Sequence, residues 1–136
     1  MPAIDLPALH QRLQPFFTQP EIQLVILFGS TATGRGHAAS DLDLAVCADR
    51  PLDTAAATAE LMRLLHVNEI DLVDLRRASP LLAYEIARTG RVIYARAPGI
   101  HAEFVSLAVR RFIDTRKLRD ARRCVIEQFL AKRGAP

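Results

Sequence analysis

This sequence has little cysteine and no long hydrophobic run, and each shortage excludes a class of protein. The two cysteines, Cys47 and Cys124, lie far apart without metal-ligand spacing, so neither a disulfide nor a zinc site is predicted. In a reducing compartment both would serve as small buried hydrophobic residues. The longest unbroken apolar run is Leu24 to Phe28, whereas a membrane-spanning helix requires roughly 20 such residues. We therefore expect a chain that does not span a membrane.

A secretory signal is also missing, because the first ten residues contain no basic segment followed by an apolar one. The cytoplasm is the expected location. Hydrophobic residues make up 50% of the 136 residues and charged residues 24%, a balance that supports a buried core and excludes disorder as the default state. The length fits one domain, so residues 1–136 are predicted to form a single unit.

Charge is unevenly distributed along the chain. The formal net charge is +3, but residues 1–95 contain 8 Lys/Arg and 11 Asp/Glu, whereas residues 96–136 contain 10 and 4. A basic C-terminal segment of this kind is suited to contact nucleic acid or an acidic protein partner. A solvated helix face explains the same composition equally well.

Hydrophobic periodicity predicts helices and strands in alternation, hence one α/β or α+β domain. The expected strands are Ile22 to Phe28, a segment around Leu42 to Val46, Glu69 to Leu75, and Arg91 to Ala95. The expected helices run from Asp5 to Phe17, from Asp53 to His66, and from Ser79 to Gly90, with Asp5, Asp53 and Ser79 as their N-caps. Gly90 is expected to be left-handed at the helix end. Residues 99–132 are helical in pattern, as one long helix or two.

The chemistry of this sequence is predicted to lie in Gly29-Ser30 and in Asp41-Leu42-Asp43, which are separated by ten residues. Asp41 and Asp43 lie two apart on a predicted strand, so both carboxylates leave one face and can bind one or two hard cations such as Mg²⁺. A Gly-Ser step after a buried strand brings backbone N–H groups and a hydroxyl close to a ligand, which makes a phosphate cradle.

Asp71 adds a third carboxylate from a neighbouring predicted strand, and three clustered acids favour bound cations over a core role. Two metal ions would clamp an in-line phosphoryl or nucleotidyl transfer. Asp74 is the weaker candidate because of the alternation of faces. The plainer explanation is that Asp41 caps a turn, Asp43 faces solvent and Ser30 ends a strand.

The stretches around Phe28-Gly29-Ser30, Gly34, Ser40 to Val46 and Ile70 to Leu75 resemble the minimal nucleotidyltransferases of the polymerase beta superfamily. More narrowly, they are similar to the MNT antitoxins encoded beside HEPN ribonuclease toxins. The likeness covers about residues 22–95, and the basic C-terminal helical segment, about residues 99–132, also suits that group. The resemblance implies the nucleotidyltransferase fold, a small mixed sheet flanked by helices with a long C-terminal helical segment.

The resemblance also implies an activity: transfer of AMP from Mg-ATP to a tyrosine of a cognate HEPN toxin, which silences the toxin. Gly29 and Ser30 would hold the triphosphate, and Asp41 and Asp43 would bind both magnesium ions. Asp71 would complete the site of one ion and act as general base.

Further contacts with the nucleotide are implied for Ser40 and for Arg35 or His37. Arg35 follows the first loop glycine, Gly34, whereas related sequences often place an arginine just before it, so the identity of the phosphate-binding arginine stays open. The toxin and ATP are the expected partners, an oligomer with the toxin is compatible with the sequence, and nucleic acid is not expected as a direct substrate.

Two other functions remain open. One is an enzyme of the same fold acting on a small molecule, such as an aminoglycoside-type antibiotic, although such relatives usually carry an additional helical domain. The other is a non-catalytic module whose basic helix binds a partner, such as a toxin, or RNA. Retention of three acids counts against it, because clustered carboxylates repel one another without metal.

Overall fold

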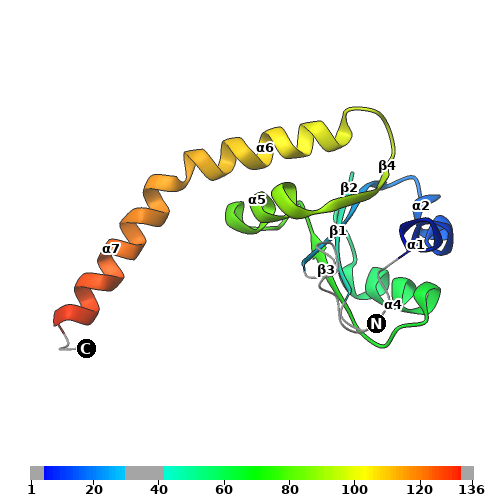
Figure 1. Cartoon of the computed structure of the whole chain (residues 1–136), viewed down its shortest axis with the longest axis horizontal. Coiled ribbons are helices and arrows are strands. Elements are labelled where there is room, and N and C mark those ends of the chain that lie inside the picture. Colours follow the sequence, from blue (N-terminus) through cyan, green and yellow to red (C-terminus); the bar gives the residue numbers. More distant parts are fainter. Residues whose placement is uncertain (1–4, 30–41, 133–136) are drawn as a thin grey trace.

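A four-stranded mixed sheet with helices on both faces forms the centre of the molecule (Figure 1). The structure, a computed structural model, describes residues 5–29 and 42–132. The strand order is β3-β2-β1-β4, in which β2 and β3 are parallel and the other pairs antiparallel. The strands are β1 (Ile22–Phe28), β2 (Leu42–Ala48), β3 (Ile70–Asp74) and β4 (Arg91–Ala95). The predicted fold class is confirmed.

The helices pack as two layers on opposite faces of this sheet. Among the described residues they are α1 (Leu6–Arg12), α2 (Gln14–Phe17), α4 (Thr54–Leu65), α5 (Pro80–Thr89), α6 (Ile100–Asp114) and α7 (Arg116–Lys132). Side chains of α1, α2 and α4 share one hydrophobic cluster with the sheet, whereas α5 and α6 contribute to a second cluster on the other face. None of the helices in the described part of the chain is long and apolar enough to cross a membrane.

β1 is buried on both faces, as its continuous apolar sequence predicts. Leu24 and Ile26 point into the α5/α6 side, and Val25 and Leu27 into the α1/α2/α4 side. Because β1 lies between β2 and β4, its apolar residues join both layers of the core.

The expected single helix from Asp5 to Phe17 is wrong in one respect, since it is divided into α1 and α2. Pro15 has no N–H to donate to the carbonyl of Gln11, so the helical hydrogen-bond ladder cannot continue through this point. Asp5 does occupy the N-cap position of α1, but its side chain makes no capping hydrogen bond.

The predicted caps of the next two helices are confirmed. The Asp53 carboxylate accepts a hydrogen bond from the Ala56 N–H at 3.1 Å, and the Ser79 hydroxyl accepts one from the Leu82 N–H at 3.2 Å. Each bond satisfies an N–H group that the first turn of a helix leaves without a partner. Short local sequence signals therefore place the starts of α4 and α5.

Gly90 follows α5, but the expected left-handed conformation is wrong, because its φ is −75° and its ψ is 157°, which is extended backbone. Glycine is required here for close packing instead. A Cβ atom at this position would overlap with Cγ2 of Ile26 on β1 and would lie 2.6 Å from the carbonyl oxygen of Ile86. The end of α5 thus approaches the central strand more closely than any side chain would permit.

The C-terminal segment forms two helices, which answers the question that the sequence left open. Thr115 separates α6 from α7, and α7 extends away from the rest of the molecule without burying any residue (Figure 1). The expectation that both cysteines are buried is wrong for Cys124, which lies exposed on α7. Cys47 on β2 is partly buried, and this burial raises the pKa of its thiol.

We expect Gly90→Ala to lower the free energy of unfolding by about 1–3 kcal/mol, because the added methyl group must displace Ile26 or the end of α5. Urea denaturation measures the change. Ala59→Ser on the exposed side of α4 is the control, with a change expected within about 0.5 kcal/mol. Equal stability of Gly90→Ala and the parent protein would contradict the close packing described here.

Candidate functional site

Two of the predicted acidic residues meet at the edge of the sheet where β1 ends and β2 and β3 begin. Asp43 on β2 is the Cα partner of Asp71 on β3 in the parallel ladder, and it also pairs with Phe28 at the end of β1. Paired residues of parallel strands direct their side chains to the same face, with neighbouring strands about 4.8 Å apart. The structure therefore brings the carboxylates of Asp43 and Asp71 together.

The two carboxylates differ in their access to solvent. β3 is an edge strand of the sheet, and Asp71 is exposed. Asp43 lies one strand further in and is only partly exposed. A molecule approaching from outside the sheet edge reaches Asp71 first.

Gly29 lies directly beside this acidic pair. It follows β1 with a φ of +75°, a left-handed conformation that glycine adopts without strain. A Cβ atom at this position would overlap with Oδ2 of Asp43 and would lie 3.1 Å from its Cγ. The absence of a side chain at Gly29 is thus what leaves room for the Asp43 carboxylate.

This donor set has the chemistry of a divalent cation site. Adjacent ionised carboxylates repel one another, and a hard cation relieves the repulsion by binding their oxygens. Mg²⁺ prefers one or two carboxylates together with substrate phosphates. Asp43 and Asp71 fit these requirements.

The remaining predicted site residues lie outside the described residues: Ser30, Arg35, His37, Ser40 and Asp41. Within residues 5–29 and 42–132, no three His, Cys, Asp or Glu side chains are grouped as a metal site. Asp41, the acid predicted to join Asp43 and Asp71 in the cluster, lies outside these ranges. Gly29, Asp43 and Asp71 form the described part of the site.

Asp74 stabilises the turn after β3, in agreement with its being the weaker candidate for a metal ligand. It pairs with Val46 at the opposite end of β3, and its side chain is 7% exposed. Its Oδ1 accepts a hydrogen bond from the Arg76 N–H at 3.0 Å, which supports the turn after the strand. Asp74 is thus separated from the carboxylate pair.

Both tyrosines pack against phenylalanine rings. The Tyr94 ring stacks on Phe17 with centroids 4.6 Å apart, and the Tyr84 ring stacks on Phe112 at 4.0 Å. These contacts connect β4 with α2 and α5 with α6.

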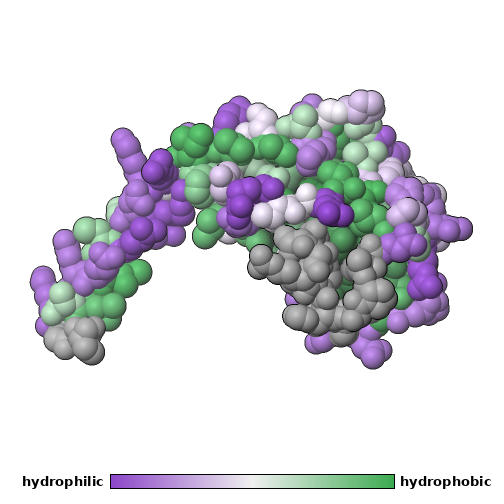
Figure 2. Space-filling view, viewed as in Figure 1, coloured by the Kyte–Doolittle hydropathy of each residue, from purple (hydrophilic) through white to green (hydrophobic). Residues whose placement is uncertain are grey.

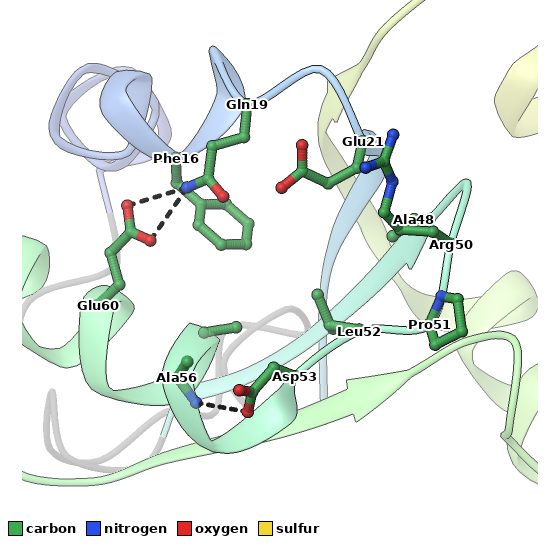
Figure 3. A pocket seen from close by; sticks show the side chains of 11 residues that line it. Phe16, Gln19, Glu21, Ala48, Arg50, Pro51, Leu52, Asp53, Ala56 and Glu60 are labelled. Atoms are coloured by element: carbon green, nitrogen blue, oxygen red, sulfur yellow. Dashed lines mark hydrogen bonds between the residues drawn. The ribbon is translucent and has the colours of Figure 1, made fainter.

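A pocket of about 230 Å³ lies at the other end of β2, between α2 and α4 (Figure 3). Its wall includes three acidic residues, two of which are already engaged. Nε2 of Gln19 donates to both carboxylate oxygens of Glu60 at 3.0 Å, and Asp53 caps α4. The pocket contains neither Asp43 nor Asp71, so it is separate from the carboxylate pair.

The structure adds one feature that the sequence reasoning missed, the close approach of Gly29 to Asp43. The motif placed these residues in one site, but it assigned Gly29 only to phosphate binding. The pairing of Phe28 with Asp43 explains the contact, since it puts the residue after β1 beside the start of β2. A local pattern carries no signal for such a pairing between strands.

The chain was compared with known proteins. Residues 11–98 match the family described as Polymerase beta, Nucleotidyltransferase. A curated relative from Shewanella oneidensis, named Protein adenylyltransferase MntA, is 31% identical over 118 residues, which cover 85% of this chain and 82% of the relative. The name agrees with the narrower resemblance to MNT antitoxins.

Solved structures show the same relationship. A crystal structure of a toxin-antitoxin with AMP-PNP superimposes with a TM-score of 0.71 at 26% identity, covering 93% of this chain and 99% of the other. A second crystal structure, of the toxin-antitoxin MntA-HepT, gives 0.64 at 25% identity, covering 92% and 96%. Together with the paired carboxylates beside a glycine turn, the family match over residues 11–98 leads to one conclusion: the chain belongs to the polymerase beta nucleotidyltransferase family.

Proposed function

We propose that this protein is an antitoxin that transfers AMP from ATP to a tyrosine hydroxyl of a cognate HEPN toxin and thereby neutralises the toxin. The observation that carries the proposal is the register of Asp43 with Asp71 beside Gly29 at an open sheet edge. The relative named Protein adenylyltransferase MntA and the toxin-antitoxin structure with AMP-PNP support the choice of reaction and of nucleotide.

The proposal includes the organisation and location of the chain. The whole of residues 1–136 acts as one minimal nucleotidyltransferase domain, with a core of about residues 22–95 and a C-terminal helical segment of about residues 99–132. The protein works in the cytoplasm, a location that suits two free cysteines and an ATP-dependent reaction.

In this proposal Asp43 and Asp71, together with Asp41, hold Mg²⁺, with two ions per site. When bound, the metal charge offsets the negative charge that develops on the phosphate oxygens. The fit of the donor set supports this assignment, because Asp43 and Asp71 are hard oxygen ligands side by side on one face.

The chain's own residues position the reactants. Gly29 and Ser30 bind the triphosphate, with Arg35 and Ser40 as additional contacts. Asp71 accepts the proton of the tyrosine hydroxyl as general base. The hydroxyl oxygen then forms a bond to the α-phosphorus, the bond between that phosphorus and the pyrophosphate oxygen breaks, and pyrophosphate leaves.

A protein acceptor can reach the described part of the site. Asp71 lies exposed on an edge strand, where a protein surface can approach.

The proposal is tested by incubating the purified protein with Mg-ATP and the HEPN toxin encoded beside it. Intact mass spectrometry of both proteins should show a gain of one or more AMP units on the toxin, lost when the modified tyrosine is replaced by phenylalanine. If the toxin binds this protein but its mass does not change, the protein is a non-catalytic antitoxin. Absence of binding and transfer, with AMP transfer to an aminoglycoside, would establish the small-molecule enzyme.

We expect Asp43→Asn and Asp71→Asn each to lower the rate of AMP transfer on the order of a hundredfold or more, because each removes a charge that serves the phosphate transfer. The measurement is the initial rate of toxin modification. Asp49→Asn is the matched control, since Asp49 is an exposed acid just beyond the opposite end of β2 that pairs with Arg50. Normal rates of toxin modification by both the Asp43→Asn and the Asp71→Asn variant would contradict the proposed mechanism.

We expect Gly29→Ala to abolish most transfer activity, because the new Cβ atom would displace the Asp43 carboxylate. Gly99→Ala is the control: Gly99 also has a positive φ, of +92°, but no atom within 4 Å of the added Cβ atom. Both variants should lose about 1 kcal/mol of stability from backbone strain, so thermal unfolding should not separate them. Equal transfer rates in the two variants would show that the contact with Asp43 is unimportant.

A further inference from the structure

We propose that α7 is a docking arm for a protein partner whose surface has an apolar groove edged with carboxylates, and that a stack of three side chains sets the direction of this arm. In the setting of the proposed function, on which this part of the inference rests, the partner is the toxin that accepts AMP. The stack consists of Tyr84, Phe112 and Arg119.

α7 exposes more apolar surface than a solvated helix requires. None of its residues is buried, and its large apolar side chains are between 47% and 64% exposed: Leu118, Val125, Ile126, Phe129 and Leu130. Figure 2 shows hydrophobic surface gathered along one side of α7 and hydrophilic surface along another. Contiguous exposed apolar patches typically mark sites of interaction.

Helical spacing places these residues together. Leu118, Val125 and Phe129 recur at intervals of seven and four residues, and Ile126 and Leu130 form the adjoining row. Arg122, four residues after Leu118, lies within the same row. We call these six residues the docking face.

Charge identifies the kind of partner. α7 contains six basic residues and two acidic ones, and both acids, Asp120 and Glu127, lie roughly opposite the docking face by helical spacing. The face therefore presents apolar side chains and arginine without a carboxylate. Its complement is an apolar groove with acidic residues at the rim.

The same charges disfavour other occupants. A second copy of the chain would place arginine against arginine across the docking face, which costs free energy. A membrane surface would have to accommodate Arg122 in the middle of the apolar stripe. RNA would contact the arginines but would leave five aliphatic and aromatic side chains uncovered, only one of them a ring on which a base can stack.

Arg119 in the first turn of α7 is bound back to the end of α6. Its Nη1 donates to the carbonyl oxygen of Phe112 at 3.0 Å and to the Thr115 hydroxyl at 2.6 Å. Its Cζ also lies 3.9 Å from the centroid of the Phe112 ring, as in a cation–π contact. These contacts span the junction between α6 and α7 and hold the two helices at one angle.

Phe112 connects the junction between α6 and α7 to α5. Its other contact is the Tyr84 ring of α5, stacked at 4.0 Å with an interplanar angle of 11°. α5 follows β3, the strand that carries Asp71, after a short connection. The direction of the arm is thereby coupled to the position of the carboxylate pair, so a docked partner meets the site in one orientation.

The docking face is tested with the double variant Val125→Glu/Phe129→Glu. Its dissociation constant for the purified toxin should rise at least about tenfold, as expected for loss of central contacts in an interface. The matched control is Cys124→Glu/Gln128→Glu, which adds the same charge at the same spacing on another side of α7, where both residues are exposed. The control should bind the toxin like the parent protein, and a thermal shift with Mg-ATP should be the same in all three.

Equal dissociation constants of both double variants for the toxin would overturn the proposal that the docking face binds it. The proposal would also be overturned if the parent protein were a dimer and the Val125→Glu/Phe129→Glu variant a monomer. The same holds if this variant lost binding only to RNA or to anionic vesicles. Toxin that binds through the docking face without gaining AMP would instead refute the proposed activity and leave the docking arm standing. The two failures are therefore distinguishable.

The stack is tested by Arg119→Lys and Phe112→Leu, which keep the charge and the apolar character but remove the stacked geometry. Both should lower kcat for toxin modification about tenfold or more through misplacement of the acceptor, while the dissociation constant for toxin stays within threefold. Phe112→Tyr keeps the ring and should restore kcat. A loss of thermal stability in Phe112→Leu without a fall in kcat, or no rescue by Phe112→Tyr, would contradict a positioning role.

Discussion

The parallel pairing of β2 with β3 is the constraint on which the candidate site depends. In this register Asp43 faces Asp71 across one strand spacing, and a shift by one residue would turn one of the two carboxylates to the opposite face of the sheet. Both strands contribute to holding this register, because Leu42 and Leu44 of β2 and Ile70 of β3 belong to the hydrophobic cluster under α1, α2 and α4. Core packing thus determines which acids meet.

Such a site opposes stability, since adjacent carboxylates repel one another. The rest of the fold compensates with an apolar central strand buried on both faces. A cation bound by the paired carboxylates would relieve their repulsion. The membership in the polymerase beta nucleotidyltransferase family gives this repulsion a chemical reason.

The C-terminal half has a different physical character. α6 packs against α5 and the sheet, but α7 has no buried residue, although most of the stability of a helix in a protein comes from packing of its apolar face. A partner that covers α7 would bury its apolar side chains and pair with its basic ones. The contacts of Arg119 with Phe112 and Thr115 give the arm a defined direction before any partner binds.

The sequence by itself determined the elements whose signals are local. The apolar run of β1 and the capping residues Asp53 and Ser79 were predicted at their observed positions, and the Gly-Ser and Asp-x-Asp spacing predicted the family. The sequence also predicted that Asp71 joins Asp43 in one site. Only the tertiary structure decided how distant segments meet: the parallel register that pairs Asp71 with Asp43, Gly29 against that carboxylate, and an extended Gly90 packed on Ile26. The exposure of Cys124 was likewise decided by the direction of α7. Strand register and the packing of helices depend on residues far apart in the chain, so periodicity and capping, which act over a few residues, cannot specify them.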